Sequence, residues 1–578
     1  MEQMQQFEQM LDEERAILNI ATPGSVGALA LSGGGIRAAS VARGFLQKLN
    51  HGGLIRRLHY ISSVSGGGYA AAEFLVSRGQ GTLARDDVPQ LGYSVKKAGL
   101  IWAAEVLFRI LPLVLLATLV YLSFPSMLEV GGHDFNRTIL FATILISSLI
   151  MALALGRAGE KWRLVRQVSA SVFFFLAIVW TFQMVGPLAS TIATASFFIL
   201  LSGYARTMPH RKDILDDFRH WPRWLIFCLT VSAMLWMAPS LIEFKRQYPA
   251  ALWAIVGGVV LAYVYAAWTM LSKSESSNQR KYGEPVFSYY RNQLAHCFVK
   301  ADQPLKALNY EGMPFPIFNT TAYDGRVRDR FEMTPLYFGS NRHQYIRAAH
   351  LPTNVTVADA MAASGGAVDG AYHDWDNRAL TSLFFAGTGF WLFFVPGRLT
   401  CSMIVALTTR VIRNTPSNRF LRLSDGGFTD NLGIVALLKR RVGMILCLDA
   451  AYDPKFEFED LRNACQIAAS EGIATIDTSD LTEFAHTHRF SGAGPRFLCM
   501  NINYGDGKPG VLILVKLASI ASTVSKQRFR HFPHITTSDQ QLKESELDEL
   551  YCIGEELASE CEKTLTARLD AMSTPRDS

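Results

Sequence analysis

The stretch HYISSVSGGGYAAAEF, residues 59–74, contains a serine, Ser65, directly before three consecutive glycines. Tyr60 and Ile61 suit a short buried strand, whereas the alanine-rich segment 69–74 suits a helix. Ser65 is therefore expected at a strand-to-helix corner, where small neighbours let the chain turn sharply and expose a hydroxyl group. This geometry is typical of a catalytic nucleophile, although Ser-Gly runs also form ordinary turns without any chemistry.

A second strand–loop–helix pattern lies upstream, in SVGALALSGGGIRAAS, residues 25–40. Residues 28–31 suit an apolar strand, and residues 36–49 suit an amphipathic helix. The glycines between them bring backbone N–H groups to a helix N-terminus, which is a favourable place for an anion.

Three functions compete for this glycine loop. A Walker phosphate loop is excluded because no Gly-Lys-Ser/Thr follows. Gly33, Gly35 and Ala38 match the GxGxxA dinucleotide fingerprint, but the second strand ends in serines instead of a ribose-binding acid. The third function is an oxyanion hole, in which the Gly34 and Gly35 N–H groups face a carbonyl oxygen attacked by Ser65.

A candidate base lies far downstream, in FLRLSDGGFTDNLGIVALLKRRVGMILCLDA, residues 420–450. The pattern predicts a strand over 421–423, a tight turn at Asp425, a helix over 431–440 and a buried strand over 442–448. An acid in a glycine turn after a strand is held in place, but an Asp-Gly turn alone is a weak signal.

Composition limits the classes of protein that this chain can belong to. Its 578 residues leave room for more than one domain, and 49% of them are hydrophobic. The net charge of +6 is small for this length and gives no support to nucleic-acid binding. The eight cysteines show no metal-ligand spacing, and the polar, acidic N-terminus does not resemble a signal peptide.

Long apolar segments predict membrane helices between about residues 100 and 272. About 20 apolar residues span a bilayer, so the third segment is long enough to cross twice, which gives six helices. The segments are 110–128, 138–156, 167–205, 224–242 and 250–272. Loop charges agree with this count by the positive-inside rule, and the lack of ionisable groups within the segments favours an anchor over a transporter.

The three motifs together, GGGIR, SVSGG and SDGGFTDNLG, resemble the patatin-like phospholipase family. The resemblance covers roughly residues 25–98 and 280–560, and PFPIFNTTAYDG, VTVADAMAASGGAV and FPHITTSDQ add to it without an assigned catalytic role. It implies an α/β fold, a patatin-like sheet flanked by helices, here interrupted by an inserted bundle of about six transmembrane α-helices.

The resemblance also implies a Ser-Asp dyad that needs no metal and no cofactor. The residues carried over are the nucleophile Ser65, the base Asp425, the oxyanion-loop glycines Gly33, Gly34 and Gly35, and Arg37, which would steady that loop or meet a lipid phosphate. This chain departs from the family at Ser63, where the nucleophile motif usually has glycine, and at Ala38, where a second glycine often follows the basic residue.

The expected organisation has three parts: residues 1–98 with the nucleophile, the membrane insertion 99–272, and residues 273–578 with the acid. The expected function is a membrane-embedded lipid acyl hydrolase of phospholipase A or lysophospholipase type, multi-pass, with its catalytic domain on the cytoplasmic side. The alternatives are a catalytically silent lipid-binding or scaffolding protein and, less favoured, a transporter. The apolar segment 380–396 is expected either to lie at the membrane interface over the site or to form a buried helix.

Overall fold

The structure is a computed structural model. It describes residues 4–20, 22–78, 247, 285–299, 301–323, 328–351, 354–367, 390–393, 420–490, 494–505, 509–518, 532–536 and 542–573. The chain divides into one compact unit of Met1–Leu107 with Thr269–Ser578 and a second unit, Phe108–Trp268. All elements named below belong to the first unit.

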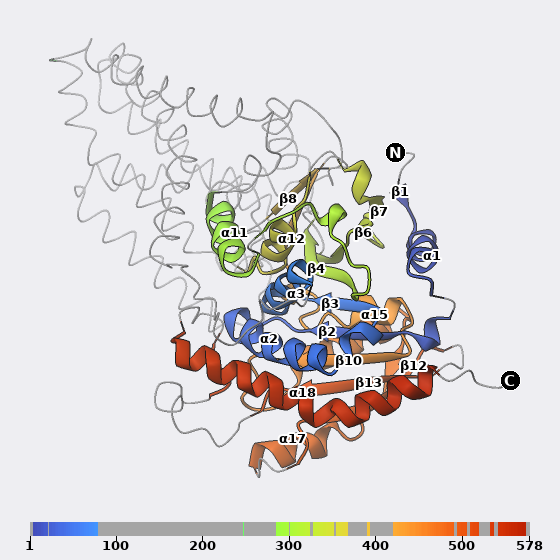
Figure 1. Ribbon diagram of the computed structural model, residues 1–578. Helices are drawn as coiled ribbons and strands as arrows, with labels where there is room; N and C mark the ends of the chain where they lie inside the picture. Colours follow the sequence, from blue (N-terminus) through green and yellow to red (C-terminus); the bar gives the residue numbers. More distant parts are fainter. Residues whose placement is uncertain are drawn as a thin grey trace, which may run out of the picture. The chain divides into compact units, whose positions relative to one another are not determined.

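A mixed β-sheet runs through this unit (Figure 1). Its parallel centre consists, in spatial order, of β4 (Phe315–Tyr323), β3 (Tyr60–Ser63), β2 (Gly27–Leu31), β10 (Met444–Asp449) and β13 (Pro509–Lys516). Antiparallel strands extend the sheet beyond β4, namely β5 (Arg328–Met333), β6 (Tyr337–Ser340), β7 (Gln344–Arg347) and β1 (Met4–Gln5). Beyond β13 follow β12 (Phe497–Asn503) and β11 (Thr475–Ile476).

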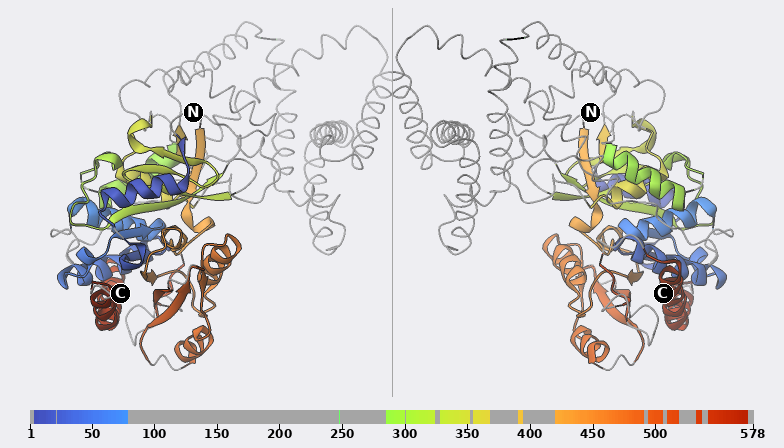
Figure 2. Two further views of the ribbon diagram at one scale, coloured as in Figure 1. Left: turned by 90° about the vertical axis from the view of Figure 1, so that its right-hand side faces the viewer. Right: turned by 90° about the vertical axis from the view of Figure 1, so that its left-hand side faces the viewer.

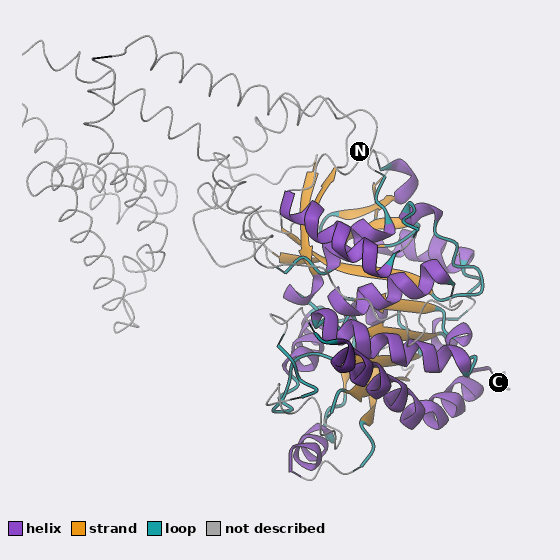
Figure 3. Cartoon of the chain, turned by 60° about the vertical axis from the view of Figure 1, so that its left-hand side comes forward, coloured by secondary structure: helices purple, strands orange, loops and turns teal. Residues whose placement is uncertain are grey.

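Helices cover both faces of the central strands, because side chains along a strand alternate between its faces. Leu29 and Leu31 of β2 face one helical layer, whereas Ala28 and Ala30 face the other. The first layer contains α2 (Gly35–His51), α3 (Ser65–Ser77), α11 (Pro285–Phe298), α12 (Val357–Ser364) and α18 (Glu544–Ser573). The second contains α15 (Val435–Lys439), α16 (Glu459–Ser470) and α17 (Leu481–Phe490), and Figures 2 and 3 show the strands between the layers.

The carboxyl ends of two strands meet along one edge of β4. On that edge β3 pairs in parallel, with Ser63 opposite Phe318, and β9 (Phe420–Asp425) pairs antiparallel, with Asp425 opposite Thr320. The other edge of β4 is occupied by β5. Since β3 and β9 run towards each other on one template strand, their last residues lie close together.

The helix α18 lies along α2 in the first layer (Figure 1). Two glycines allow the backbones to approach closely. A Cβ atom on Gly44 would lie 2.0 Å from the Tyr551 carbonyl oxygen, and one on Gly554 would lie 2.0 Å from the Val41 carbonyl oxygen. Each helix therefore presents a glycine to the backbone of the other.

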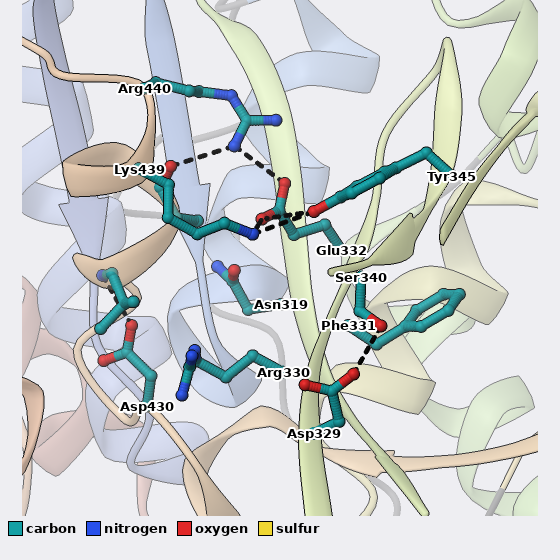
Figure 4. A network of polar contacts seen from close by, with 12 residues as sticks. Asn319, Asp329, Arg330, Phe331, Glu332, Ser340, Tyr345, Asp430, Lys439 and Arg440 are labelled. Atoms are coloured by element: carbon teal, nitrogen blue, oxygen red, sulfur yellow. Dashed lines mark hydrogen bonds and ion pairs between the residues drawn. The ribbon is translucent and has the colours of Figure 1, made fainter. Parts of the chain in front are cut away.

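A buried ion network attaches the N-terminal helix α1 (Phe7–Ile17) to the sheet, and Figure 4 shows its part around Glu332. Arg440 Nε and Nη2 donate to the two carboxylate oxygens of Glu14 at 2.8 and 3.1 Å. Arg440 Nη1 and Lys439 Nζ pair with Glu332 at 2.8 and 3.3 Å. Each buried charge thus has an opposite partner, which buried ion pairs require.

The predicted fold class is wrong in one respect, the inserted bundle of transmembrane helices. Within the described ranges, no helix combines the length and the apolar character needed to cross a bilayer. The helix α18 has 30 residues, but charged side chains occur along its whole length. The structure supports a mixed α/β sheet with helices in place of a sheet with an inserted bundle. The predicted multi-pass localisation depended on the same helices and is corrected with them. The five apolar segments that suggested it lie entirely outside the described residues.

Most local predictions around the motifs are confirmed, because β2, α2, β3 and α3 form where the patterns place them. Two differ. The helix predicted over 431–440 begins only at Val435, because Gly433 has a φ of +69° and Asp430 accepts the N–H groups of both residues. In the apolar segment 380–396, the described residues form a strand, β8 (Phe390–Phe393), which pairs with β9.

We expect Gly44→Ala to destabilise the fold. In an ordinary helix interior the same change would stabilise the helix, because glycine there is less favourable than alanine by about 1 kcal/mol. The added methyl group would meet the Tyr551 carbonyl oxygen, and such overpacking costs about 1–3 kcal/mol. Thermal unfolding measures the effect. Gly24→Ala is the control because a Cβ atom there meets no atom within 4 Å. A melting temperature for Gly44→Ala at or above that of the wild type would contradict the close helix contact.

Candidate active site

Ser65 occupies the corner between β3 and α3. It is the first residue of α3, its φ is +47°, and its side chain is largely buried. The left-handed region is costly for a residue with a Cβ atom, so the surrounding structure must hold it there. The following glycines make the tight corner possible, since a Cβ atom on Gly66 would lie 2.0 Å from the Gly35 oxygen. One on Gly67 would lie 2.5 Å from the Leu31 oxygen.

Asp425 is the last residue of β9 and lies beside Ser65. Its Oδ1 accepts the Gly427 N–H at 2.7 Å, and the Ser65 hydroxyl is near enough to lower the pKa of Asp425 by hydrogen bonding. Burial raises the pKa of Asp425 to about 6, and these two hydrogen bonds act in the opposite direction. A carboxylate with a pKa near neutrality, bonded to a serine hydroxyl, can accept a proton from that hydroxyl.

The glycine loop joins β2 to α2 and lies against Ser65, with a Cβ atom on Gly33 only 3.3 Å from the Ser65 Cβ. The Gly33 N–H is already used, because it donates to the Asn431 carbonyl oxygen at 2.9 Å. Gly34 and Gly35 have φ values of +143° and +61°. Within the described ranges, neither of these two residues donates its N–H to another group. Two amides at the N-terminus of α2 are thus available for an anion.

Arg37 is buried under the glycine loop, in the first turn of α2. Its Nε donates to the Ala450 carbonyl oxygen at 3.0 Å, and its Nη1 donates to the Ile535 carbonyl oxygen. Burial lowers the pKa of the Arg37 guanidinium to about 10, so it stays charged at neutral pH. These contacts tie α2 to the loop after β10. They favour the first of the two expected roles, support of the glycine loop, over contact with a lipid phosphate.

The two departures from the family pattern fit into the corner. Ser63 and Ala38 are both 1% exposed, so each small side chain is accommodated inside the fold. Asn319 of β4, to which the sequence assigned no role, donates to Ser62 Oγ at 2.8 Å and to the Ser63 oxygen at 3.1 Å. A polar Asn inside an apolar strand was the only signal for this contact.

A serine hydrolase can also use a histidine as its base, but two buried histidines of this chain, His488 and His534, have other partners. His488 Nε2 lies 3.1 Å from the Pro495 oxygen, and His534 Nδ1 accepts the Asp453 N–H at 3.3 Å. Burial lowers the pKa of His534 to about 3, which keeps its ring neutral. Among the described residues, no group of three or more His, Cys, Asp or Glu side chains is placed to hold a metal ion.

Comparison with known proteins gives a distant structural likeness. No family model matches the chain, and no curated protein matches it. Among solved structures, the chain is similar to human GIVD cytosolic phospholipase A2, with a TM-score of 0.46 and 12% identity over 98% of this chain and 63% of that one. The same enzyme with methyl gamma-linolenyl fluorophosphonate gives a TM-score of 0.40 and 11% identity, covering 97% and 62% of the two chains. The chain thus spans less than two thirds of that enzyme's length, and a likeness this distant assigns no activity.

We expect Asp425→Asn to raise stability at neutral pH, because it removes a charge that burial disfavours. The folded pKa of about 6 lies above the ordinary value of 3.8 for an aspartate, so the stability contributed by Asp425 is lost as the pH rises through 6. The full difference corresponds to about 3 kcal/mol. Thermal unfolding at about pH 5 and about pH 8 should show the larger gain at the higher pH. No gain at the higher pH would mean that the carboxylate is not desolvated.

Proposed function

We propose that this chain is a serine acyl hydrolase that cleaves fatty-acyl esters of lipids, with Ser65 as the nucleophile and Asp425 as the base. The observation that carries the proposal is the position of Ser65 beside the buried Asp425 carboxylate, where the ends of β3 and β9 meet on one edge of β4. A serine hydroxyl is a weak nucleophile until a base beside it accepts its proton.

The reaction follows from this pair. Asp425 takes the Ser65 proton while Oγ attacks the ester carbonyl, and the carbonyl electron pair moves to the oxygen. As the tetrahedral intermediate collapses, the alcohol leaves with the proton from Asp425, and Ser65 keeps the acyl group. Water then attacks the acyl-enzyme and gives its proton to Asp425. Collapse of the second intermediate returns the proton to Ser65 and releases the fatty acid.

The Gly34 and Gly35 N–H groups would bind the negative oxygen of both intermediates. They lie at the N-terminus of α2, where the helix dipole favours negative charge. Gly33 allows the loop to lie against Asn431, because a Cβ atom at this position would be only 2.2 Å from Asn431 Oδ1 and would overlap it. Preorganised donors of this kind are commonly the largest contribution to acyl-transfer catalysis.

The lipid substrate is supported by the sequence. GGGIR, SVSGG and SDGGFTDNLG occur in the order and context of the patatin-like phospholipases. Phospholipids and lysophospholipids are therefore the first substrates to test.

Removing either member of the dyad should abolish hydrolysis. We expect Ser65→Ala and Asp425→Asn to lower fatty-acid release from phospholipid and lysophospholipid micelles by at least about 1,000-fold. The measurement is made with a chelator present. Ser77→Ala is the matched control, because Ser77 lies at the other end of α3 and its hydroxyl donates to the Phe74 oxygen of the same helix. If the wild type releases no fatty acid from any of these lipids, the catalytically silent lipid-binding protein becomes the better explanation.

The pH dependence tests the base directly. Only deprotonated Asp425 can accept the serine proton, so kcat/KM should rise with pH around an inflection at about 6. Asp430 has a similarly raised pKa of about 6, but it accepts the Gly433 and Val435 N–H groups. Asp430→Asn should therefore keep the inflection. If the inflection disappears in Asp430→Asn, or if the wild-type profile is flat, Asp425 is not the base.

A further inference from the structure

The N–H of Ser65 has a partner far away in the sequence. It donates to the hydroxyl of Ser364 at 2.9 Å, across 299 residues of sequence separation. Ser364 is the last residue of α12 and is fully buried. A left-handed residue at a helix start needs such a fixed partner, because its backbone conformation is otherwise unfavourable.

Both hydrogen-bonding functions of this hydroxyl are used. While its oxygen accepts from Ser65, its proton is donated to the Asn319 carbonyl oxygen at 2.6 Å. A hydroxyl group can donate and accept at the same time, which neither a methyl group nor a hydrogen atom can do. Ser364 therefore connects the nucleophile corner to β4, the strand that also pairs with β9.

The same segment reaches the acid. Two residues after Ser364, the Gly366 carbonyl oxygen accepts the Ser424 hydroxyl at 2.7 Å, and Ser424 directly precedes Asp425. Thr321 of β4 donates to the Asp425 carbonyl oxygen at 2.8 Å. The end of α12 and the middle of β4 thus hold the main chain on both sides of the dyad.

We propose that Ser364 is a positioning residue for acyl transfer, whose hydroxyl fixes the Ser65 backbone so that the Ser65 Oγ faces Asp425. This inference rests on the proposed hydrolase function. Without the hydroxyl, the Ser65 N–H loses its acceptor and the corner can leave its left-handed conformation. The nucleophile then moves relative to its base and to the glycine amides. The rest of the substrate-binding surface keeps its position. We therefore expect turnover to fall while substrate binding is unchanged.

The test compares kcat and KM of wild type and Ser364→Ala on a water-soluble fatty-acyl ester, together with the rate of Ser65 labelling by an alkyl fluorophosphonate. We expect kcat and the labelling rate to fall by about 100-fold, the usual result of a misplaced reacting group, with KM within about threefold. Ser364→Thr, which keeps the hydroxyl, should recover most of the labelling rate.

Thr334→Ala is the matched control. The Thr334 hydroxyl is also buried, donates to the Tyr337 oxygen at 2.9 Å and accepts the Tyr337 N–H at 2.9 Å, but it lies in the β5–β6 turn. The Thr334→Ala protein should be less stable than the wild type but should keep the wild-type kcat per folded molecule. The inference is overturned if Ser364→Ala, corrected for its folded fraction, turns over and labels like this control.

If Ser364→Ala does not fold, Ser364→Cys decides, because a thiol is a weak acceptor of about the same shape. Labelling of Ser364→Cys at the wild-type rate overturns the inference, and labelling at least about tenfold slower supports it. An active wild type with an equally active Ser364→Ala rejects the positioning role alone. A wild type that neither turns over nor labels at Ser65 rejects the proposed function and this inference together.

Discussion

The position of Ser65, the proposed nucleophile, beside Asp425, the proposed base, depends on one edge of β4. Residues 315–318 of this strand pair with β3, and residues 320–323 pair with β9, which runs in the opposite direction. The residue between them, Asn319, bonds the end of β3 through its side chain. Because sheet register is fixed by backbone hydrogen bonds, it fixes how far apart the two strand ends lie. The meeting of Ser65 with Asp425 is therefore a property of the sheet, even though the two residues are 360 positions apart in the sequence (425 − 65).

The same arrangement costs stability. Ser65 has a left-handed backbone, and Asp425 keeps a carboxylate inside the fold, where burial raises its pKa to about 6. Each feature is unfavourable by itself, and each is useful for chemistry only if it is held in place. The Ser65 N–H donates to Ser364, and Thr321 and Gly427 donate to Asp425, and these hydrogen bonds hold both residues. The buried hydroxyl and amide groups around the dyad thus offset strain at the site as well as satisfying each other.

How much the sequence reveals depends on how local the determinant is. The strand–loop–helix corners at Gly33 and Ser65 are predicted correctly, since apolar periodicity and glycine position are local signals. For the apolar segment 380–396 the sequence predicts an interfacial segment or a buried helix. Its described residues, 390–393, form the strand β8, because an apolar run alone does not separate strand from helix. Asn319 and Ser364 were not predicted as parts of the site, since their bonds to residues 62–65 span more than 250 positions.

One residue links the glycine loop to the acid turn. Asn431 accepts the Gly33 N–H with its carbonyl oxygen, and its side-chain Nδ2 donates to Asp460 Oδ2 at 2.6 Å. A Cβ atom on Gly33 or on Gly427 would lie 2.2 or 2.8 Å from its Oδ1, so the amide fills the space between the two turns. Moving the proposed oxyanion donors, the Gly34 and Gly35 N–H groups, relative to Asp425 would require displacing this anchored side chain. Donors fixed in this way need no reorganisation when charge develops on a bound ester, which is the condition under which backbone amides stabilise an oxyanion best.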